Sequence, residues 1–109
     1  MTDRSTDVIQ GTLDLLILRT LRAAPLHAFG ITRRIEDITE GVFRVNPGSL
    51  LLAFRRLERN GSVTAEWRAT ENGRNARYYR LTPKGRKQLA QETEDWRRRA
   101  AAIARLLEA

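Results

Sequence analysis

Apolar residues recur at helical spacing near the start of the chain. Between Thr12 and Ala23 they occupy positions 13, 16, 17 and 21, with a threonine at 20, which is the i, i+3, i+4 pattern of one helix face. Leu15 and Leu18 lie off this face, so the helix is apolar nearly all round and should be covered on two sides, one of them by a second subunit. Pro25 should end it.

A second helix is predicted from Ala28 to Thr39. Its apolar stripe is formed by Ile31, Ile35 and Ile38, and Gly41 should stop it. His27 directly precedes this helix and is expected to cap it or to pack beside it, with a pH-sensing role as the alternative.

The third predicted helix has an apolar back and a basic front. Asn46 is a suitable cap before Pro47, and Gly61 follows the last residue, Asn60. At 100° per residue, one face carries Leu50, Ala53, Phe54 and Leu57, and the other carries Ser49, Leu52, Arg55, Arg56 and Arg59. This layout suits a helix that packs on its own core while entering a DNA major groove.

A basic hairpin follows this helix. Residues 62–69 and 76–81 alternate between apolar and polar positions, and Asn72-Gly73 between them is a strong turn signal. Arginines stand at or beside its tip, at positions 68, 74 and 77. An arginine-tipped hairpin after a basic helix is typical of the wing of a winged helix-turn-helix.

The last predicted helix begins after the cap Thr82, with Pro83 in its first position, and runs to the end of the chain. It is about 26 residues and about 39 Å long, more than so small a body can cover. A heptad seam runs along it through Leu89, Thr93, Trp96, Ala100, Ile103 and Leu107. We favour a homodimer formed through this seam; the alternative is packing on the helix's own domain.

The expected fold class is therefore α+β and mostly α: a winged helix-turn-helix with a long C-terminal dimerisation helix. We expect a flexible N-terminus over residues 1–10, a DNA-binding domain over 11–82 and the dimerisation helix over 83–109. The length of 109 residues fits this single-domain organisation.

Composition excludes several classes of protein. There is no cysteine and a single histidine, which disfavours disulfide scaffolds, thiol catalysis, metal sites and a Ser-His triad. Acidic residues are scattered over different predicted elements, with no partner set for acid–base catalysis. We found no apolar stretch that could span a membrane and no signal peptide. The expectation is a cytoplasmic protein that is not an enzyme and has no cofactor or metal.

Positive charge is concentrated in the middle of the chain. The formal net charge is +7, and residues 44–87 alone carry eleven positive and three negative side chains. The flanking segments are close to neutral, and eighteen of the twenty basic residues are arginine, whose planar fork suits phosphates and base edges. A polyanionic partner is therefore expected at the middle segment.

Several short motifs follow one another in order along the chain: Gly11-Thr-Leu-Asp-Leu-Leu-Ile-Leu18, Pro25-Leu-His-Ala-Phe-Gly-Ile31, Gly48-Ser-Leu50, Arg56-Leu-Glu58, Gly61, Glu66-Trp67 and Arg77-Tyr-Tyr-Arg-Leu-Thr82. Together, over about residues 10 to 107, they resemble the PadR-type transcriptional regulators. The resemblance implies a homodimeric winged-helix repressor of bacteria, in the branch with a single long C-terminal helix as its dimerisation arm.

The chain departs from the family pattern at two places. It has Ala28-Phe29 where the family typically has Gly-Tyr, and Leu51-Leu52 where the family typically has Tyr-Pro. The family's phosphate or base contacts are therefore in doubt at these positions, while the scaffold is not affected. An outward-facing Leu52 could contact a thymine methyl group, or the chain could be a weaker binder.

The primary hypothesis is a sequence-specific repressor that binds a pseudo-palindromic operator in double-stranded DNA. Base-edge or phosphate contacts are expected from Ser49, Leu52, Arg55, Arg56 and Arg59, wing contacts from Arg74, Asn75 and Arg77, and contacts to the DNA backbone from Lys84 and Arg86. The alternatives are a winged-helix protein-interaction module and a nucleic-acid-binding protein without sequence preference.

A second hypothesis concerns a small aromatic effector. In a multidrug-binding branch of the resembling family, a tryptophan at the matching place lines a pore between subunits and stacks flat aromatic ligands. By this resemblance Trp96, with Leu15 or Leu18, would bind such a ligand; the alternative is that Trp96 only anchors the dimer.

Overall fold

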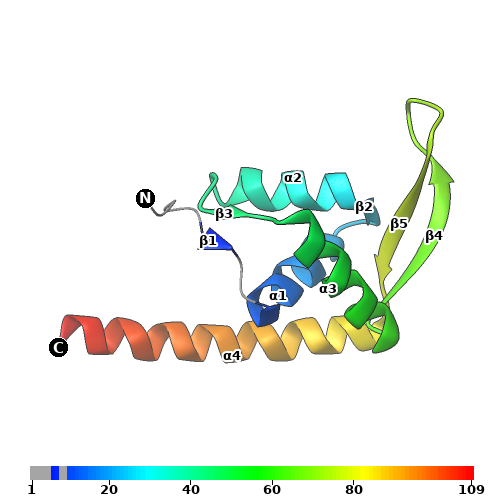
Figure 1. Cartoon of the computed structure of the whole chain (residues 1–109). Helices are drawn as coiled ribbons and strands as arrows, with labels where there is room; N and C mark the ends of the chain where they lie inside the picture. Colours follow the sequence, from blue (N-terminus) through cyan, green and yellow to red (C-terminus); the bar gives the residue numbers. More distant parts are fainter. Residues whose placement is uncertain (1–5, 8–9) are drawn as a thin grey trace.

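The computed structural model describes residues 6–7 and 10–109, and four helices account for most of them (Figure 1). Their bounds are α1 (Gln10–Leu21), α2 (Ala28–Ile38), α3 (Pro47–Arg59) and α4 (Pro83–Glu108). The strands are β1 (Thr6–Asp7), β2 (Leu26–His27), β3 (Phe43–Arg44), β4 (Val63–Ala69) and β5 (Asn75–Leu81). The predicted mostly helical fold with a small antiparallel sheet is confirmed, because all four helices and both long strands form within two residues of their expected bounds.

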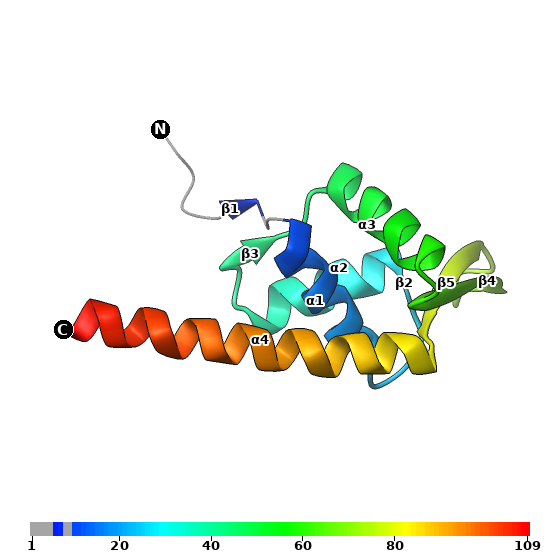
Figure 2. The ribbon, with the colours of Figure 1, turned by 90° about the horizontal axis from the view of Figure 1, so that it is seen from below.

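Helix α1 lies at the centre of the core. It contacts α2, α3 and α4, and Figures 1 and 2 show α4 passing on one side of it and α2 and α3 on the other. Leu13, Ile17, Leu18 and Leu21 are all buried. The expected cover on two sides is therefore present, but elements of the same subunit provide it, and α1 ends four residues before Pro25 rather than at it.

The start of α2 confirms the capping role of His27. Its Nδ1 accepts a hydrogen bond from the backbone N–H of Gly30 at 2.9 Å. Ile31 and Ile35 are buried as predicted, but Ile38 is 66% exposed. Ile38 is the last residue of the helix and lies at the edge of its apolar stripe, so its side chain does not reach the core.

The sheet contains one strand more than the sequence predicted. Strand β5 pairs antiparallel with β4, as expected for a hairpin, and also with β2, which places Leu26 opposite Tyr79. A second, parallel pairing joins β1 to β3. Of the terminus predicted to be flexible, Thr6–Asp7 thus form a strand, and residues 1–5 and 8–9 lie outside the described part of the chain. Two-residue strands carry no alternating pattern, which is why β1, β2 and β3 were not predicted.

A hydrogen-bonded joint fixes the start of α4 to the turn between α3 and β4. Thr82 caps α4 by accepting from the Gly85 N–H at 3.0 Å, and its own N–H donates to the Ser62 carbonyl at 3.1 Å. The buried Ser62 hydroxyl also bonds to Gln88. Gly85 packs directly against this carbonyl, so the helix leaves the turn in one fixed direction.

Helix α4 begins in the core and ends outside it. Leu89 is only 7% exposed and belongs to the subunit's own core, which removes it from the predicted dimer seam. Farther along the helix every residue from 101 to 109 is exposed, and the C-terminal end of α4 extends past the rest of the molecule (Figures 1 and 2). No helix in the described ranges is long and apolar enough to cross a membrane.

Candidate nucleic-acid interface

Helix α3 presents the two faces that its sequence predicted. The Asn46 side chain caps it by accepting from the N–H groups of Gly48 and Ser49, at 2.8 and 3.1 Å. Its back is buried through four apolar residues: Leu50, Ala53, Phe54 and Leu57. Its front exposes Ser49, Leu52, Arg55 and Arg59. The helix is therefore held rigidly by its apolar face while basic side chains stay in solvent.

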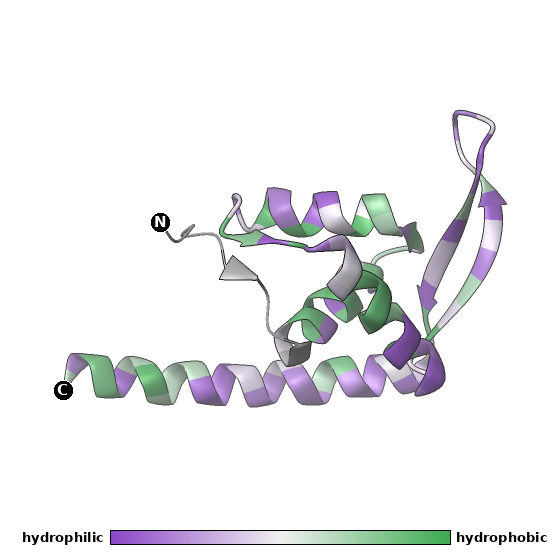
Figure 3. Ribbon diagram, in the orientation of Figure 1, coloured by the Kyte–Doolittle hydropathy of each residue, from purple (hydrophilic) through white to green (hydrophobic). Residues whose placement is uncertain are grey.

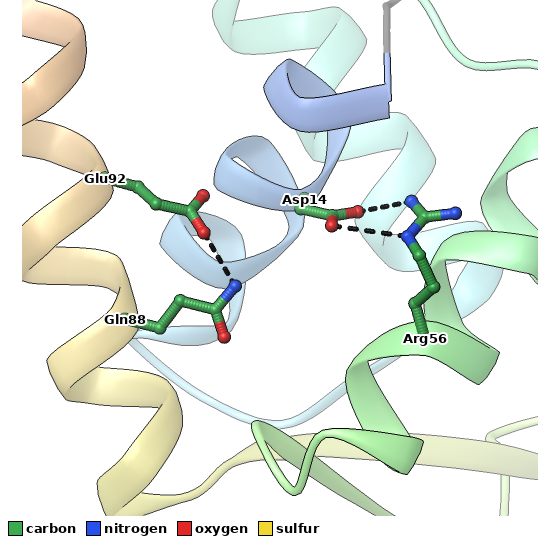
Figure 4. A network of polar contacts seen from close by, with 4 residues as sticks. All are labelled: Asp14, Arg56, Gln88 and Glu92. Atoms are coloured by element: carbon green, nitrogen blue, oxygen red, sulfur yellow. Dashed lines mark hydrogen bonds and ion pairs between the residues drawn. The ribbon is translucent and has the colours of Figure 1, made fainter.

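Arg56 differs from the other arginines of α3 because it holds an acidic partner. Its Nη2 lies 2.6 Å from Oδ1 of Asp14 on α1 (Figure 4), and the two side chains are only 26% and 16% exposed. The pair ties α3 to the central helix. Asp14 was missed as a partner, although a lone carboxylate within a run of leucines signals a specific contact. On the other flank of α1, Gln88 and Glu92 of α4 bond to each other instead (Figure 4).

Replacing Asp14 by Asn should show whether Arg56 only positions α3 or also contacts the DNA directly. We expect Asp14→Asn and Arg56→Gln each to lower the free energy of unfolding by about 1–3 kcal/mol, since each leaves a partly buried group without its partner. If Arg56 only positions α3, both variants lose the same DNA affinity. The measurements are urea unfolding and titration of operator DNA for both single variants and the double variant.

The double variant provides the control. Its loss of stability should be smaller than the sum of the single losses, because the second substitution removes a partner that is already gone. A loss of DNA affinity confined to Arg56→Gln would show that Arg56 contacts the DNA directly.

The wing is fixed to the recognition helix by a second ion pair. Nη2 of Arg77 on β5 lies 2.7 Å from Oε1 of Glu58 on α3, and this contact raises the pKa of Arg77 above its ordinary value. Beside it, the rings of Phe54 and Tyr79 stack at 3.9 Å, and burial raises the pKa of the Tyr79 hydroxyl. An ion pair and a stacked ring pair therefore join the wing to α3.

Side chains along the outer part of the wing interact with each other only at the surface. Arg68 lies 3.1 Å from Glu66 and also above the ring of Tyr78, at 5.1 Å from its centroid. Exposed pairs of this kind contribute little to stability. Trp67, one of the apolar positions in the alternating pattern of the hairpin, is exposed because the strands rise away from the core.

Five of the predicted DNA-contacting basic residues form no ion pair in the described part of the chain, and all five are exposed. They are Arg55 and Arg59 on α3, Arg74 at the wing tip, and Lys84 and Arg86 at the start of α4. Asn75 beside the tip is exposed as well. The α3 front, the wing tip and the start of α4 thus offer uncompensated positive charge to a polyanion.

The model of the "Transcriptional regulator PadR-like family" matches residues 17–91, which include α2, α3, the wing and the core half of α4. The chain belongs to this family. Its members are DNA-binding regulators of transcription, so the basic face described above belongs to a DNA-binding protein.

Relatives of this PadR-like chain support the assignment. It is 40% identical over 70 residues to transcriptional regulator Rv3488 of Mycobacterium tuberculosis. The matched region covers 64% of this chain and 61% of that protein. A transcriptional regulator of Clostridium thermocellum of known structure is 30% identical, with a TM-score of 0.80 over 89% of this chain and 94% of the other. A PadR family regulator of Eggerthella lenta, at 27% identity, has a TM-score of 0.76 over 92% and 85%.

The residues predicted to bind an aromatic effector in this PadR-like chain are only partly brought together. Trp96 is 50% exposed and lines a small hollow with Thr12 and Leu15, bordered by charged residues of α4. Leu18 is fully buried in the core and lines no part of it. Leu18 therefore leaves the candidate set because it faces inward from α1, whereas Leu15 faces α4.

Proposed function

We propose that this PadR-like chain is a repressor that binds a pseudo-palindromic operator as a homodimer. The observation that carries the proposal is that Arg55 and Arg59 are exposed and form no ion pair with any residue the structure describes, on a helix whose back is buried in the core. Two copies of α3 related by two-fold symmetry would enter successive major grooves, with half-sites on the order of 10 bp apart. This role places the protein in the cytoplasm, where its DNA is.

Each element of the interface has a distinct role in this proposal. Ser49, Leu52 and Arg55 reach base edges, and Arg59 binds phosphate. Arg74 and Asn75 contact the DNA from the wing. Arg77 stays paired with Glu58 until a DNA phosphate competes for it, and Lys84 binds the DNA backbone. Arg56 contacts the DNA only when its ion pair with Asp14 leaves the guanidinium group free to do so.

The homodimer is supported by the apolar residues that α4 leaves uncovered. Ile103, Leu106 and Leu107 are all exposed, and Figure 3 shows apolar segments recurring along the projecting end of the helix. A single helix that exposes this many large apolar side chains gains stability by burying them against a copy of itself.

The proposal is tested by a gel shift with the chain's own upstream region against a scrambled duplex of the same composition. A repressor shifts the native sequence at lower protein concentration, and its affinity falls steeply with salt. Equal affinity for both duplexes would instead indicate binding without sequence preference. No shift of either duplex at low salt would indicate a protein-interaction module.

Replacing Arg55 by Ala should weaken operator binding by about 1–3 kcal/mol, the contribution expected of an arginine that reads a base edge. The affinity for the scrambled duplex should fall less. Fluorescence anisotropy at fixed salt measures both affinities. Arg105→Ala, which removes the same charge near the far end of α4, is the matched control and should bind as the wild type does; an equal loss in both variants would exclude a specific role for Arg55.

We also propose that a planar aromatic effector binds beside Trp96 and Leu15 and releases the operator. The half-exposed indole in its hollow supports this role. Tryptophan fluorescence of a Trp67→Phe variant, titrated with planar aromatic compounds, tests it. Quenching is expected from the effector site; its absence across the panel would leave Trp96 as an anchor of the dimer.

A further inference from the structure

A second hollow lies on the other flank of the contact between α1 and α4. It has a volume of about 620 Å³ and is open to solvent. Two arginines at the end of α1, Arg19 and Arg22, face two from α4, Arg86 and Arg97, and Glu94 is the one acidic residue in its lining. Its size falls within the range of small-molecule sites.

The balance of charge sets this hollow apart from three others on the molecule. It carries four positive side chains and one negative, a net charge of +3. The hollow between α2 and the wing has two arginines and two acidic residues. The hollow beside Trp96 has one arginine and two acidic residues, and the hollow at the end of α2 has one arginine and three acidic residues. Basic side chains thus outnumber acidic ones in this hollow, whereas the other three hollows have as many or more acidic side chains than basic ones.

The contacts that the structure describes within the subunit do not account for the gathering of these four arginines. Among the residues that the structure describes, none of the four forms an ion pair. Arg19 lies in the last turn of α1, where a positive charge favours the helix dipole. That reason does not extend to Arg86 and Arg97, which lie on another helix and face the first two.

The rest of the lining is suited to an organic molecule. The half-buried Thr93 brings a hydroxyl group, and the nearly buried Leu89 and the methyl group of Ala90 add apolar surface. Guanidinium groups bind carboxylate and phosphate through paired hydrogen bonds, so four of them can hold two anionic groups at once.

We propose that this hollow binds a small organic ligand that carries two anionic groups, carboxylate or phosphate, on a compact apolar body. The ligand bridges the last turn of α1, which is part of the DNA-binding core, to the half of α4 that leads to the projecting arm. It neutralises repulsion between the two helices and so changes the position of α4 relative to α3. The effect on operator binding rests on the proposed function; the binding of the ligand does not.

Isothermal titration calorimetry of the full chain, at a constant ionic strength of about 0.15 M, tests the site. The probes are benzene-1,3-dicarboxylate, pyrophosphate and the monoanion benzoate. We expect at least one dianion to bind about tenfold more tightly than benzoate, and the Arg22→Gln/Arg97→Gln double variant to lose about tenfold or more of that affinity, because charge-assisted hydrogen bonds are the strong ones. Both residues are exposed, so the variant should fold, which circular dichroism checks.

The matched control is Arg98→Gln. Arg98 is the next residue on α4, but it pairs with Asp95 and does not line the hollow. It should bind the dianion as the wild type does. Equal losses in Arg98→Gln and the double variant, or no preference for either dianion over benzoate, would overturn the proposal.

A competition with DNA distinguishes a ligand site from a further contact with the DNA backbone. In the absence of dianion, the double variant should shift duplex DNA as the wild type does. When the wild type is saturated with duplex, the dianion should still bind to it. Loss of DNA affinity in the double variant, together with displacement of the dianion by duplex, would overturn the ligand site. If the wild type fails to bind its upstream DNA, the calorimetric result still stands by itself.

Discussion

Ile103→Glu is expected to convert the dimer into a monomer and to lower operator affinity by about 100-fold or more. The side chain is 57% exposed in the single subunit, one heptad beyond Trp96 on the projecting part of α4. A charge placed there would be buried without a partner in the dimer. Two half-sites held by one dimer gain avidity of about 10²–10⁴ over a single half-site, and a monomer loses it. Light scattering coupled to size exclusion measures the mass, and fluorescence anisotropy measures the affinity.

The matched control introduces the same charge on another side of the helix. Ala101 is exposed, and at 100° per residue it points about 140° away from Trp96. Ala101→Glu should remain a dimer and bind the operator as the wild type does. A dimeric Ile103→Glu, or an Ala101→Glu variant that dissociates equally, would show that the dimer does not use the predicted seam.

Local signals made most of the fold predictable from the sequence. The pairs Asn46-Pro47 and Thr82-Pro83 fix the starts of α3 and α4 because a capping side chain and a proline act within one turn. Asn72-Gly73 fixes the wing turn in the same way, and Gly73 has the positive φ of 79° that such a turn needs. The recognition helix and wing are therefore encoded by neighbouring residues.

Features formed by residues far apart in the sequence could not be predicted. The ion pair of Asp14 with Arg56 spans 42 residues, and the basic hollow combines Arg19 and Arg22 with arginines of α4. Counting charge along the chain places Arg19, Arg22 and Arg97 in segments close to neutral and Arg86 in the basic middle segment, so their cluster becomes visible only when the two helices lie side by side. The same reason hides β2, whose partner strand lies about fifty residues further on.

Helical periodicity identified apolar faces but not what covers them. Leu89 and Ile103 share one heptad pattern, yet the first is buried against its own subunit and the second is exposed. The difference arises because α1 lies beside only the first part of α4, from its last turn near Leu89 to its first turns near Trp96. The length of α4 indicated that part of it must lie free, and the structure shows that the free part begins near Trp96.

Gly85→Ala should lower the free energy of unfolding by about 3 kcal/mol, through overpacking of a tightly packed site. A Cβ at this position would lie 2.1 Å from the Ser62 carbonyl oxygen and 2.8 Å from Cδ1 of Leu81. That oxygen also accepts from the N–H of Thr82, so it cannot retreat without loosening the start of α4. Alanine would gain only about 1 kcal/mol from its higher helix propensity, so the clash dominates. Urea unfolding at matched protein concentration measures the loss.

Gly48→Ala is the matched control because it replaces another glycine in the first turn of a helix. There the nearest atom to a new Cβ is Oδ1 of Asn46 at 3.2 Å, and a side-chain atom can move by a few tenths of an ångström. We expect this variant to stay within about 1 kcal/mol of the wild type. Equal stability of the two variants would show that the joint between Ser62, Thr82 and Gly85 yields easily. The direction in which α4 leaves the core would then have to be set by the packing of Leu89 against α1 instead.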